Sequence, residues 1–372
     1  MPEMPFPDLI IKTTSACNLS CDYCYIQSYN NGISNKVMPL KITTKIIKDY
    51  TQLATDFGTA DEEENTLYLF WHGGEPTLAG KTYFTEVLNI EKYFSTSPHN
   101  IKNGIVTNAI SLDIDWVNFL KENDFMVSVS LDGPEQIHNL HRKYPNGNGS
   151  FNEVMRSLKL LQEYDVPFGL LNVITKDLAA QPQLFFDFLI SQNLQDIALI
   201  PYQKSDDFLL PNDWADFMIS LFDLWFDLDN PKFHIRDFTN IISGIFDRPK
   251  TLCEYNNCLI NHLCIDTNGD VYICDMFIGN SNMLLGNITE TNFKDLLESD
   301  KYIYLQNATK NHHEECLSCE YFRICGGGCF YRRFISPHGI AGKDIYCAAR
   351  KKLISHILQK IITSAKTEKV TL

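Results

Sequence analysis

The stretch "SACNLSCDYCY" (residues 15–25) places three cysteines close together, Cys17, Cys21 and Cys24. It follows the apolar segment "LIIKTT" (9–14), which is typical of a β-strand covered on both faces. Three thiolates can hold a 4Fe-4S cluster and leave one iron open to a small chelating ligand, such as an amino acid's amine and carboxylate. A structural zinc ion would need a fourth ligand, from Asp22 or a distant histidine. The spacing favours the cluster.

Five segments farther along the chain share this short, β-rich and apolar character. They are "TLYLFW" (66–71), "GIVTN" (104–108), "MVSVSL" (126–131), "FGLLNVI" (168–174) and "DIALIPY" (196–202). Apolar stripes at helical spacing separate them, one within residues 46–57 and another within 151–161. Six β/α units in succession predict an α/β fold with a parallel sheet, curved into an open barrel or laid flat.

Polar motifs stand where these strands end. "HGGEP" (72–76), "TN" (107–108) and "SLDGP" (130–134) each end or follow a strand, as the cysteine triplet does. The carboxyl ends of parallel strands meet at one edge of a sheet, and ligands bind there. We therefore expect the four motifs to converge on one rim.

Composition narrows the class of protein. The 372 residues include 21% charged and 44% hydrophobic side chains, and no apolar run has the roughly 18 to 20 residues that a membrane span needs. The start "MPEMPFPDLI" lacks the features of a signal peptide, so we expect a cytoplasmic protein without membrane contact. The net charge of −14 disfavours nucleic acid and suits a substrate with basic residues, although acidic soluble enzymes are common.

The remaining cysteines lie in the C-terminal third. None occurs between Cys24 and Cys253, and the chain contains 12 in all. Cytosolic thiols are normally reduced, so metal or cluster ligation is a better interpretation than disulfides. A helix is expected over 214–226, a hairpin over "CIDTNGDVYICD" (264–275) with its turn at Asn268-Gly269, and a closing helix. Two separate cysteine regions predict two functional modules.

The cysteine triplet with Tyr23 before its last cysteine, followed by "HGGEP" after the second strand, resembles the radical S-adenosylmethionine (radical SAM) superfamily. The resemblance implies a partial (β/α)6 TIM-like barrel and a cluster, held by Cys17, Cys21 and Cys24, whose open iron binds S-adenosylmethionine. Cleavage of that cosubstrate yields a 5'-deoxyadenosyl radical, which abstracts a hydrogen atom from the substrate.

The resemblance also assigns cosubstrate contacts. Tyr23 would pack on the cluster or the adenine, and the segment Gly73, Gly74, Glu75 and Pro76 would present backbone groups and the Glu75 carboxylate to the methionyl ammonium. Contacts with the ribose or the methionyl carboxylate would come from Asn108, Ser130, Asp132 and Arg142. For Asn108 and Asp132, ordinary loop capping is an equal alternative.

The C-terminal cysteine spacings resemble the SPASM extension of radical SAM peptide-modifying enzymes, which carries two auxiliary 4Fe-4S clusters. By position, one cluster would use Cys253, Cys258, Cys274 and Cys329, and the other Cys316, Cys319, Cys325 and Cys347. A pair of zinc sites is the alternative. Cys264 is left over on the first hairpin arm, where we expect a small buried core residue, or a substitute for Cys253.

Asp275, next to Cys274, is the candidate base that removes a proton as the substrate radical is oxidised. The alternative is a solvated turn aspartate. The predicted domains are a radical SAM barrel (1–205), a helical bridge (206–250), the SPASM domain (251–350) and a C-terminal helix and tail (351–372).

Two peptide chemistries compete. "HGGEPTLAG", "SLDGPEQIHNLHRK" and "HEECLSCEYFRIC" look like anaerobic sulfatase maturases, which oxidise Cys or Ser to formylglycine. "WHGG", "CGGGCFYRR" and "GKDIYCAARKKLISHI" look more like maturases that form a C–C cross-link (cyclophane) in a ribosomally made precursor peptide, and we expect this activity. The partners would be a precursor peptide or nascent protein and a reductant such as flavodoxin or ferredoxin. A non-catalytic zinc-binding interaction module is the alternative of another class.

Overall fold

The computed structural model describes residues 7–26, 37–57, 66–94, 100–204, 207–256 and 262–370. The chain divides into two compact units, each assembled from separate stretches. Unit 1 comprises residues 1–130, 139–168 and 258–307, and unit 2 comprises 131–138, 169–257 and 308–372. Two helices cross a division between units, α5 (Glu135–His141) and α13 (Asp300–Lys310). No helix within these described stretches is both long and apolar enough to span a bilayer.

Unit 1 alternates strands and helices and then adds a cysteine-containing hairpin. Its other regular elements are β1 (Asp8–Thr14), α2 (Leu40–Phe57), β2 (Thr66–Gly73), α3 (Lys81–Phe94), β3 (Asn100–Thr107), α4 (Ile114–Glu122), β4 (Met126–Ser130), α6 (Phe151–Glu163), β10 (His262–Ile265), β11 (Asp270–Tyr272), β12 (Leu284–Asn287) and α12 (Phe293–Leu297). The four expected strands of this unit are confirmed, with β3 beginning four residues earlier than predicted.

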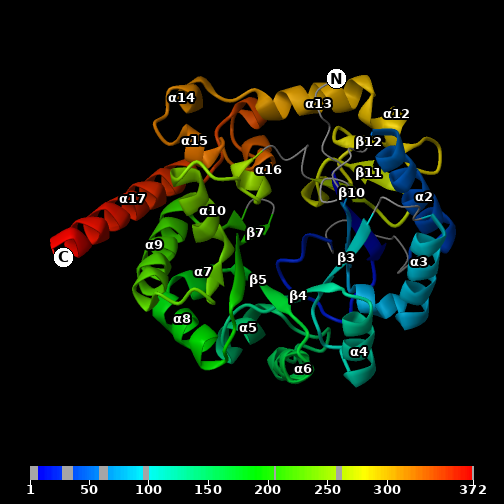
Figure 1. The fold of residues 1–372 in the computed structure, drawn as a ribbon, viewed down its shortest axis with the longest axis horizontal. Helices are drawn as coiled ribbons and strands as arrows, with labels where there is room; N and C mark the ends of the chain where they lie inside the picture. The colour runs from blue at the N-terminus through cyan, green and yellow to red at the C-terminus, as the bar shows by residue number, and fades with distance from the viewer. Residues whose placement is uncertain are drawn as a thin grey trace. The chain divides into compact units, whose positions relative to one another are not determined.

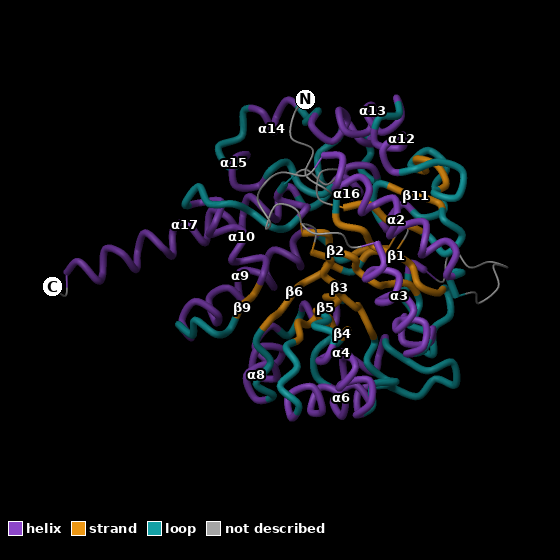
Figure 2. Tube along the Cα trace, turned by 45° about the vertical axis from the view of Figure 1, so that its right-hand side comes forward, coloured by secondary structure: helices purple, strands orange, loops and turns teal. Residues whose placement is uncertain are grey.

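The strands of unit 1 lie in the order β12-β11-β10-β1-β2-β3-β4. Neighbours from β1 to β4 are parallel, and their inward side chains, such as Leu9, Leu69 and Ile105, are buried, as continuous apolar strands predict. Figure 2 shows β1, β2 and β3 as adjacent strands, and Figure 1 shows α2 beside α3.

The predicted hairpin is present as β10 and β11, joined by a turn that contains Asn268 and Gly269. Sequence reasoning did not anticipate that β10 also pairs in parallel with β1, so that Ile10 lies opposite Cys264. Residues more than 250 positions apart thus join one sheet. The pairing places the residues after β11 in the same unit as the cysteine triplet.

Unit 2 contains the last strands and most of the C-terminal helices. Its regular elements are β5 (Phe168–Ile174), α7 (Lys176–Ala179), α8 (Pro182–Ser191), β6 (Asp196–Pro201), β7 (Gln203–Lys204), β8 (Asp207–Phe208), α9 (Pro211–Leu228), β9 (His234–Ile235), α10 (Arg236–Ile245), α14 (Glu314–Leu317), α15 (Phe322–Cys325), α16 (Phe330–Phe334) and α17 (Cys347–Val370). Strands β5, β6 and β9 are parallel neighbours. The closing helix begins at Cys347, four residues before the predicted position.

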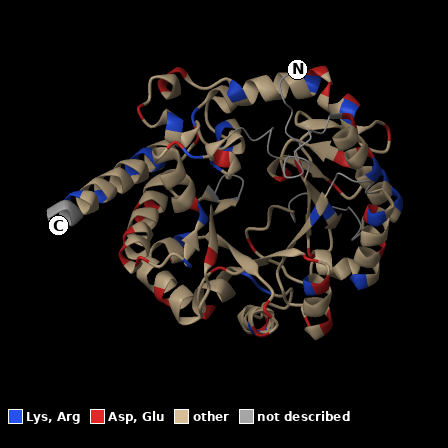
Figure 3. Ribbon diagram, viewed as in Figure 1, with Lys and Arg blue, Asp and Glu red and all other residues tan. Residues whose placement is uncertain are grey.

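Helices α9 and α17 pack together in unit 2. Lys352 pairs with Asp216 at 2.5 Å, and Lys360 pairs with Asp227 at 2.9 Å. Figure 3 shows acidic residues along the ribbon of α9 and basic residues along that of α17. Because these pairs are exposed, each contributes at most about 1 kcal/mol to the free energy of unfolding. The apolar faces of the two helices therefore supply most of the stabilisation of their packing.

Candidate functional site

The cysteine triplet lies in the loop that leaves β1, and all three thiols are half-buried. The Leu19 N–H donates to Cys17 Sγ at 3.4 Å. The pKa of the Cys17 thiol is raised to about 11, chiefly by burial and in smaller part by the charges of Glu75 and Cys24, against the lowering effect of the Leu19 N–H and the Asn108 amide. Such thiols become thiolates when a metal centre supplies positive charge, so the donor set suits a cluster.

The "HGGEP" segment clamps this loop through close backbone contacts. The Gly74 N–H donates to Thr14 O at 2.7 Å, and the Glu75 N–H donates to Ala16 O at 2.8 Å. A Cβ atom on Gly74 would lie 2.1 Å from Ala16 O, so the two backbones meet only because residue 74 is glycine. The second motif therefore fixes where the cysteine loop begins.

Glu75 is fully buried and ties three segments together. Its carboxylate accepts hydrogen bonds from the Thr77 N–H at 3.1 Å, the Thr77 and Thr107 hydroxyls at 2.7 Å each, and the Asn108 N–H at 2.7 Å. Burial raises the pKa of Glu75, and these four donors counteract the rise. The carboxylate thus has a structural role in addition to its expected contact with the methionyl ammonium, which stays a prediction.

Asn108 lies against the cysteine loop. Its amide donates to Asn18 Oδ1 at 2.7 Å and to Cys17 Sγ at 3.7 Å. Asn18 in turn donates to Ser111 Oγ at 3.2 Å. Sequence reasoning missed Asn18, although it directly follows the first cysteine. The structure therefore brings Asn108 to the first cysteine, as convergence of the strand ends predicts.

The other two candidates from the fourth strand end belong to different units. Ser130 ends β4 in unit 1, and Asp132 lies in unit 2. Asp132 is fully buried, and its Oδ1 accepts from the Val173 N–H of β5 at 2.9 Å. This contact anchors the loop, which is the alternative role that the sequence left open for Asp132.

Tyr23 and Arg142 contact each other. The Arg142 guanidinium lies 5.5 Å from the centre of the Tyr23 ring, and both side chains are buried. The His141 ring is 5.9 Å from the Tyr23 ring, and His141 Nδ1 lies 3.0 Å from Asp22 Oδ2. The last residue of α5 and the residue after it thus contact the second half of the cysteine loop. This stacking holds Arg142 and Tyr23 together next to Cys24.

Asp275 belongs to a half-buried polar cluster in unit 1, and its own side chain is 20% exposed. Its Oδ2 accepts from the Tyr25 hydroxyl at 2.6 Å and lies 3.5 Å from Lys12 Nζ, and Lys12 also reaches the Tyr25 hydroxyl at 2.7 Å and His72 Nδ1 at 3.3 Å. Burial alone would raise the pKa of Asp275, but Lys12, His72 and the Tyr25 hydrogen bond hold it well below its usual range. Burial and Lys12 lower the pKa of His72 to about 3.

Sequence reasoning missed Lys12, Tyr25 and His72 as partners of Asp275. A signal for Lys12 was present, because it is the lone charged side chain in the apolar strand segment "LIIKTT" and is 2% exposed. A buried lysine requires a counter-charge, and the pairing of β10 with β1 supplies the Asp275 segment. Asp275 is therefore a half-buried, ion-paired carboxylate and not the solvated turn aspartate of the alternative.

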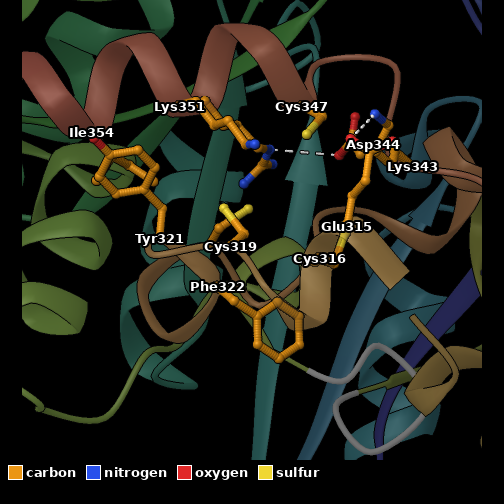
Figure 4. A pocket seen from close by; sticks show the side chains of 13 residues that line it. Glu315, Cys316, Cys319, Tyr321, Phe322, Lys343, Asp344, Cys347, Lys351 and Ile354 are labelled. Atoms are coloured by element: carbon orange, nitrogen blue, oxygen red, sulfur yellow. Dashed lines mark hydrogen bonds and ion pairs between the residues drawn. The ribbon is translucent and has the colours of Figure 1, made fainter. Parts of the chain in front are cut away.

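Four of the C-terminal cysteines line one pocket of unit 2. Cys316, Cys319, Cys325 and Cys347 line this pocket together with Lys343, Asp344, Arg350 and Lys351. Figure 4 shows the side chains of Cys316, Cys319 and Cys347 directed into this space. Burial, and then the charge of Asp344, raises the pKa of Cys325 to about 12, and burial also raises the pKa of Cys316 and Cys347. Four thiols that line one pocket match the number of thiolate ligands that a 4Fe-4S cluster requires.

The other proposed ligand set is distributed differently. In unit 2, burial raises the pKa of Cys329 to about 11, Arg332 lowers it, and neighbouring Cys253 raises it. Cys274 lies in unit 1, and its Sγ is 3.4 Å from Asp275 Oδ1. Cys258 falls outside the described residues. Cys264 is fully buried and packs with Tyr272, Ile278, Ile10 and Leu284, which confirms the expected core role.

Comparison with known proteins places this geometry in a family. The model of the radical SAM superfamily matches residues 11–187, and the model of the SPASM iron-sulfur cluster-binding domain matches residues 253–320. A cysteine-type anaerobic sulfatase-maturating enzyme of Clostridium novyi is 32% identical, over 96% of this chain and 97% of that enzyme. The chain belongs to the radical SAM superfamily. The α/β radical SAM fold with a SPASM domain, the enzyme class, and 4Fe-4S clusters with S-adenosylmethionine as cofactors are thus as expected.

Another relative and a solved structure have names of the same kind. A serine-type anaerobic sulfatase-maturating enzyme of Bacteroides thetaiotaomicron is 25% identical, over 94% of this chain and 89% of that enzyme. The solved structure of native anSMEcpe with bound AdoMet and the Cp18Cys peptide matches with a TM-score of 0.85 and 28% identity, over 97% of this chain and 99% of that chain. The expectation of a cross-linking cyclophane maturase is wrong, because whole-length relatives are sulfatase-maturating enzymes. The tail motifs that suggested cross-linking were short and carried no chemistry specific to it.

Proposed function

We propose that this radical SAM enzyme is a cysteine-type anaerobic sulfatase-maturating enzyme, which oxidises a cysteine side chain of a sulfatase polypeptide to formylglycine. The observation that carries the proposal is the whole-length similarity to cysteine-type enzymes, at 28 to 32% identity. Serine-type enzymes are 24 to 25% identical over similar lengths. The substrate is therefore a peptide segment, as in the peptide-bound structure of anSMEcpe.

Three cofactor sites follow from the cysteine positions. Cys17, Cys21 and Cys24 hold the cluster that binds S-adenosylmethionine, with Tyr23, the Gly73 to Pro76 segment, Asn108, Ser130, Asp132 and Arg142 as its surroundings. Cys316, Cys319, Cys325 and Cys347 hold one auxiliary cluster, which their shared pocket supports. The second auxiliary cluster uses Cys253, Cys258, Cys274 and Cys329. The domain boundaries 1–205, 206–250, 251–350 and 351–372 remain part of this proposal.

When bound, the radical SAM cluster and S-adenosylmethionine supply a radical that takes one hydrogen atom from the substrate Cβ, and the auxiliary clusters supply an acceptor for one electron. The protein must remove the remaining thiol proton, which leaves a thioaldehyde carbon that water converts to the aldehyde with release of hydrogen sulfide. The Asp275 carboxylate receives this proton. Lys12 and Tyr25 hold that carboxylate ionised and in one orientation, through contacts of 3.5 and 2.6 Å.

The contacts of Asp275 limit which protons it can accept. A carboxylate that already accepts a hydrogen bond and faces an ammonium is a weak base. It suits a proton that has become acidic because its carbon carries the radical. A flavodoxin or ferredoxin supplies the electron that starts each turnover.

The proposal is tested with an anaerobically reconstituted enzyme and a sulfatase-derived peptide that contains the modification-site cysteine. Mass spectrometry should show replacement of the cysteine sulfur by an aldehyde oxygen, and a hydrazine reagent should capture that aldehyde. The matched control is the same peptide with Cys→Ala, which should remain unmodified. A peptide with Cys→Ser should react more slowly. Loss of two hydrogens from the cysteine-free peptide, without aldehyde formation, would contradict the proposal.

A further inference from the structure

A buried network of four charged side chains lies in unit 2. Arg332 and Arg350 both pair with Glu254 Oε2. Arg332 Nε lies 3.1 Å and Arg350 Nε 3.5 Å from Asp344 Oδ2. The four side chains are 1 to 18% exposed, so two guanidinium groups and two carboxylates share an interior with little water. Removing one member of such a set leaves a buried charge uncompensated, which is strongly unfavourable.

Each member of this network is attached to a segment that carries a proposed cluster ligand. Glu254 directly follows Cys253 in the chain. The Cys329 N–H donates to Asp344 Oδ2 at 2.8 Å, and Arg332 follows on the same helix, α16. Arg350 lies one turn after Cys347 on α17, and Asp344 lies three residues before Cys347. The network therefore connects Cys253 and Cys329 of one ligand set with Cys347 of the other.

Arg350 faces both ligand sets. It lines the pocket of Cys316, Cys319, Cys325 and Cys347, and the charge of Cys253 also acts on it. Its guanidinium lies 4.6 Å from the centre of the Tyr255 ring, two residues after Cys253. Arg350 Nη1 is buried and has no hydrogen-bond partner among the described residues. A buried guanidinium N–H without an acceptor, beside a pocket lined by four thiols, points to a negatively charged ligand in that pocket.

We propose that Arg332, Arg350, Glu254 and Asp344 are positioning residues that couple the two auxiliary cluster sites and set the reduction potentials of the clusters bound there. This inference rests on the proposed assignment of the auxiliary clusters. Reduction adds one negative charge to a cluster, and the local net charge is one of the properties that determine its potential. The two arginines favour the reduced state, the two carboxylates disfavour it, and the near-neutral sum keeps both clusters able to accept and pass on an electron.

The test uses the full chain with Cys17, Cys21 and Cys24 all changed to Ala, so that the remaining iron belongs to the auxiliary clusters. Redox titration monitored by electron paramagnetic resonance gives their potentials. Arg350→Gln should lower the potential of at least one cluster enough to change its reduced-to-oxidised ratio tenfold, which is about 59 mV for a one-electron couple. Glu254→Gln should shift it in the opposite direction. Arg350→Lys keeps the charge and should stay close to the parent value.

The double variant Glu254→Gln/Arg350→Gln separates charge from folding. It removes one positive and one negative charge, so its potential should return toward the parent value even if either single variant is unstable. The exposed pair Lys352 and Asp216 on α17 and α9 is the matched control, and Lys352→Gln and Asp216→Asn should not change the potentials. Absence of iron in the triple cysteine variant would overturn the cluster assignment itself. Retained iron with potentials that do not change, or change in the same direction for Arg350→Gln and Glu254→Gln, would overturn this inference alone.

Discussion

The two cysteine regions of the enzyme differ in the chemical groups that surround their thiols. In unit 1, backbone groups and neutral amides surround Cys17, and two glycines allow one segment to approach another closely. In unit 2, the pocket of Cys316, Cys319, Cys325 and Cys347 is lined by Lys343, Asp344, Arg350 and Lys351. The first arrangement fixes a loop, and with three cysteines the proposed cluster has its fourth position open to a ligand. In the proposed assignment, the second surrounds four ligands with charged side chains, which suits storage and transfer of an electron.

The largest expected effect separates the two regions by function. Cys17→Ala should abolish formation of 5'-deoxyadenosine and of the aldehyde, because it removes a ligand of the cluster that binds the cosubstrate. Cys347→Ala should abolish aldehyde formation and leave cosubstrate cleavage measurable, because its pocket serves the electron after cleavage. Chromatography of 5'-deoxyadenosine and mass spectrometry of the peptide measure the two products.

Cys264→Ala is the matched control for both substitutions. This thiol is fully buried in the core beside Tyr272, so the variant should keep the parent iron content. The comparison would fail if Cys17→Ala and Cys347→Ala lost the same product to the same extent.

The next largest effect is expected at Asp275, the proposed proton acceptor. Asp275→Asn keeps the size of the side chain and removes the proton acceptor, so aldehyde formation should fall by about 100- to 10,000-fold. Formation of 5'-deoxyadenosine should continue, uncoupled from peptide oxidation. Asp270→Asn in the same hairpin is the control and should keep activity, because the Asp270 carboxylate accepts hydrogen bonds from Asn268 and Asn287 and not from the Lys12 and Tyr25 side chains. Equal loss of both products in Asp275→Asn would assign the residue to binding instead.

How well the sequence predicts each region follows from the range of the interactions involved. The strands and the convergence of Asn108 on Cys17 are predictable, because apolar periodicity and the parallel βα pattern are local features. The partners of Asp275 are not, because the pairing of Ile10 with Cys264 joins segments whose separation leaves no local signal. The sequence shows Gly74 only as part of the "HGGEP" motif. A glycine is needed there because its backbone contacts that of Ala16, which is a tertiary contact.

The arginine network shows the same limit. Arg332 and Arg350 stand in segments of ordinary basic composition, and nothing nearby in sequence indicates that both pair with Glu254. The substrate chemistry was also mispredicted from short tail motifs, since whole-chain similarity carries information that a few residues do not. Cys264, in contrast, was predictable as core from its place on a hairpin arm.

Substitution of Gly74 tests whether the close approach of two backbone segments fixes the cysteine loop of unit 1. In Gly74→Ala, the new Cβ would lie 2.1 Å from Ala16 O, and because both partners are backbone, relief requires the cysteine loop to move. We expect a loss of about 3 kcal/mol in the free energy of unfolding, the upper end of the usual cost of overpacking. Gly169→Ala is the control, since its Cβ would meet nothing closer than 3.7 Å. Denaturant unfolding measures both, and equal stabilities would contradict the clamp.

The smallest expected effect concerns a second difference between the units, namely which partners compensate a carboxyl group shielded from water. Glu254 in unit 2 pairs with two arginines, whereas Glu91 in unit 1 accepts one hydrogen bond from Asn103 at 2.9 Å, and its other oxygen has no partner among the described residues. Burial raises the pKa of Glu91 to about 7 from 4.5. The folded state therefore holds this proton more tightly than the unfolded state, and the stabilisation is complete below pH 4.5 and lost as the pH rises to about 7.

Glu91→Gln replaces this titrating group by a neutral amide of the same shape. Burial also raises the pKa of Asp8 to about 7, so both proteins keep that common pH dependence, and only the difference between them reports on Glu91. Relative to the variant, the parent should lose up to roughly 2 to 3 kcal/mol of unfolding free energy between pH 4.5 and 7, at about 1.4 kcal/mol per unit of pKa shift. Parallel stability curves for the two proteins over this range would show that Glu91 has a counter-charge, and the contrast between the units would then disappear.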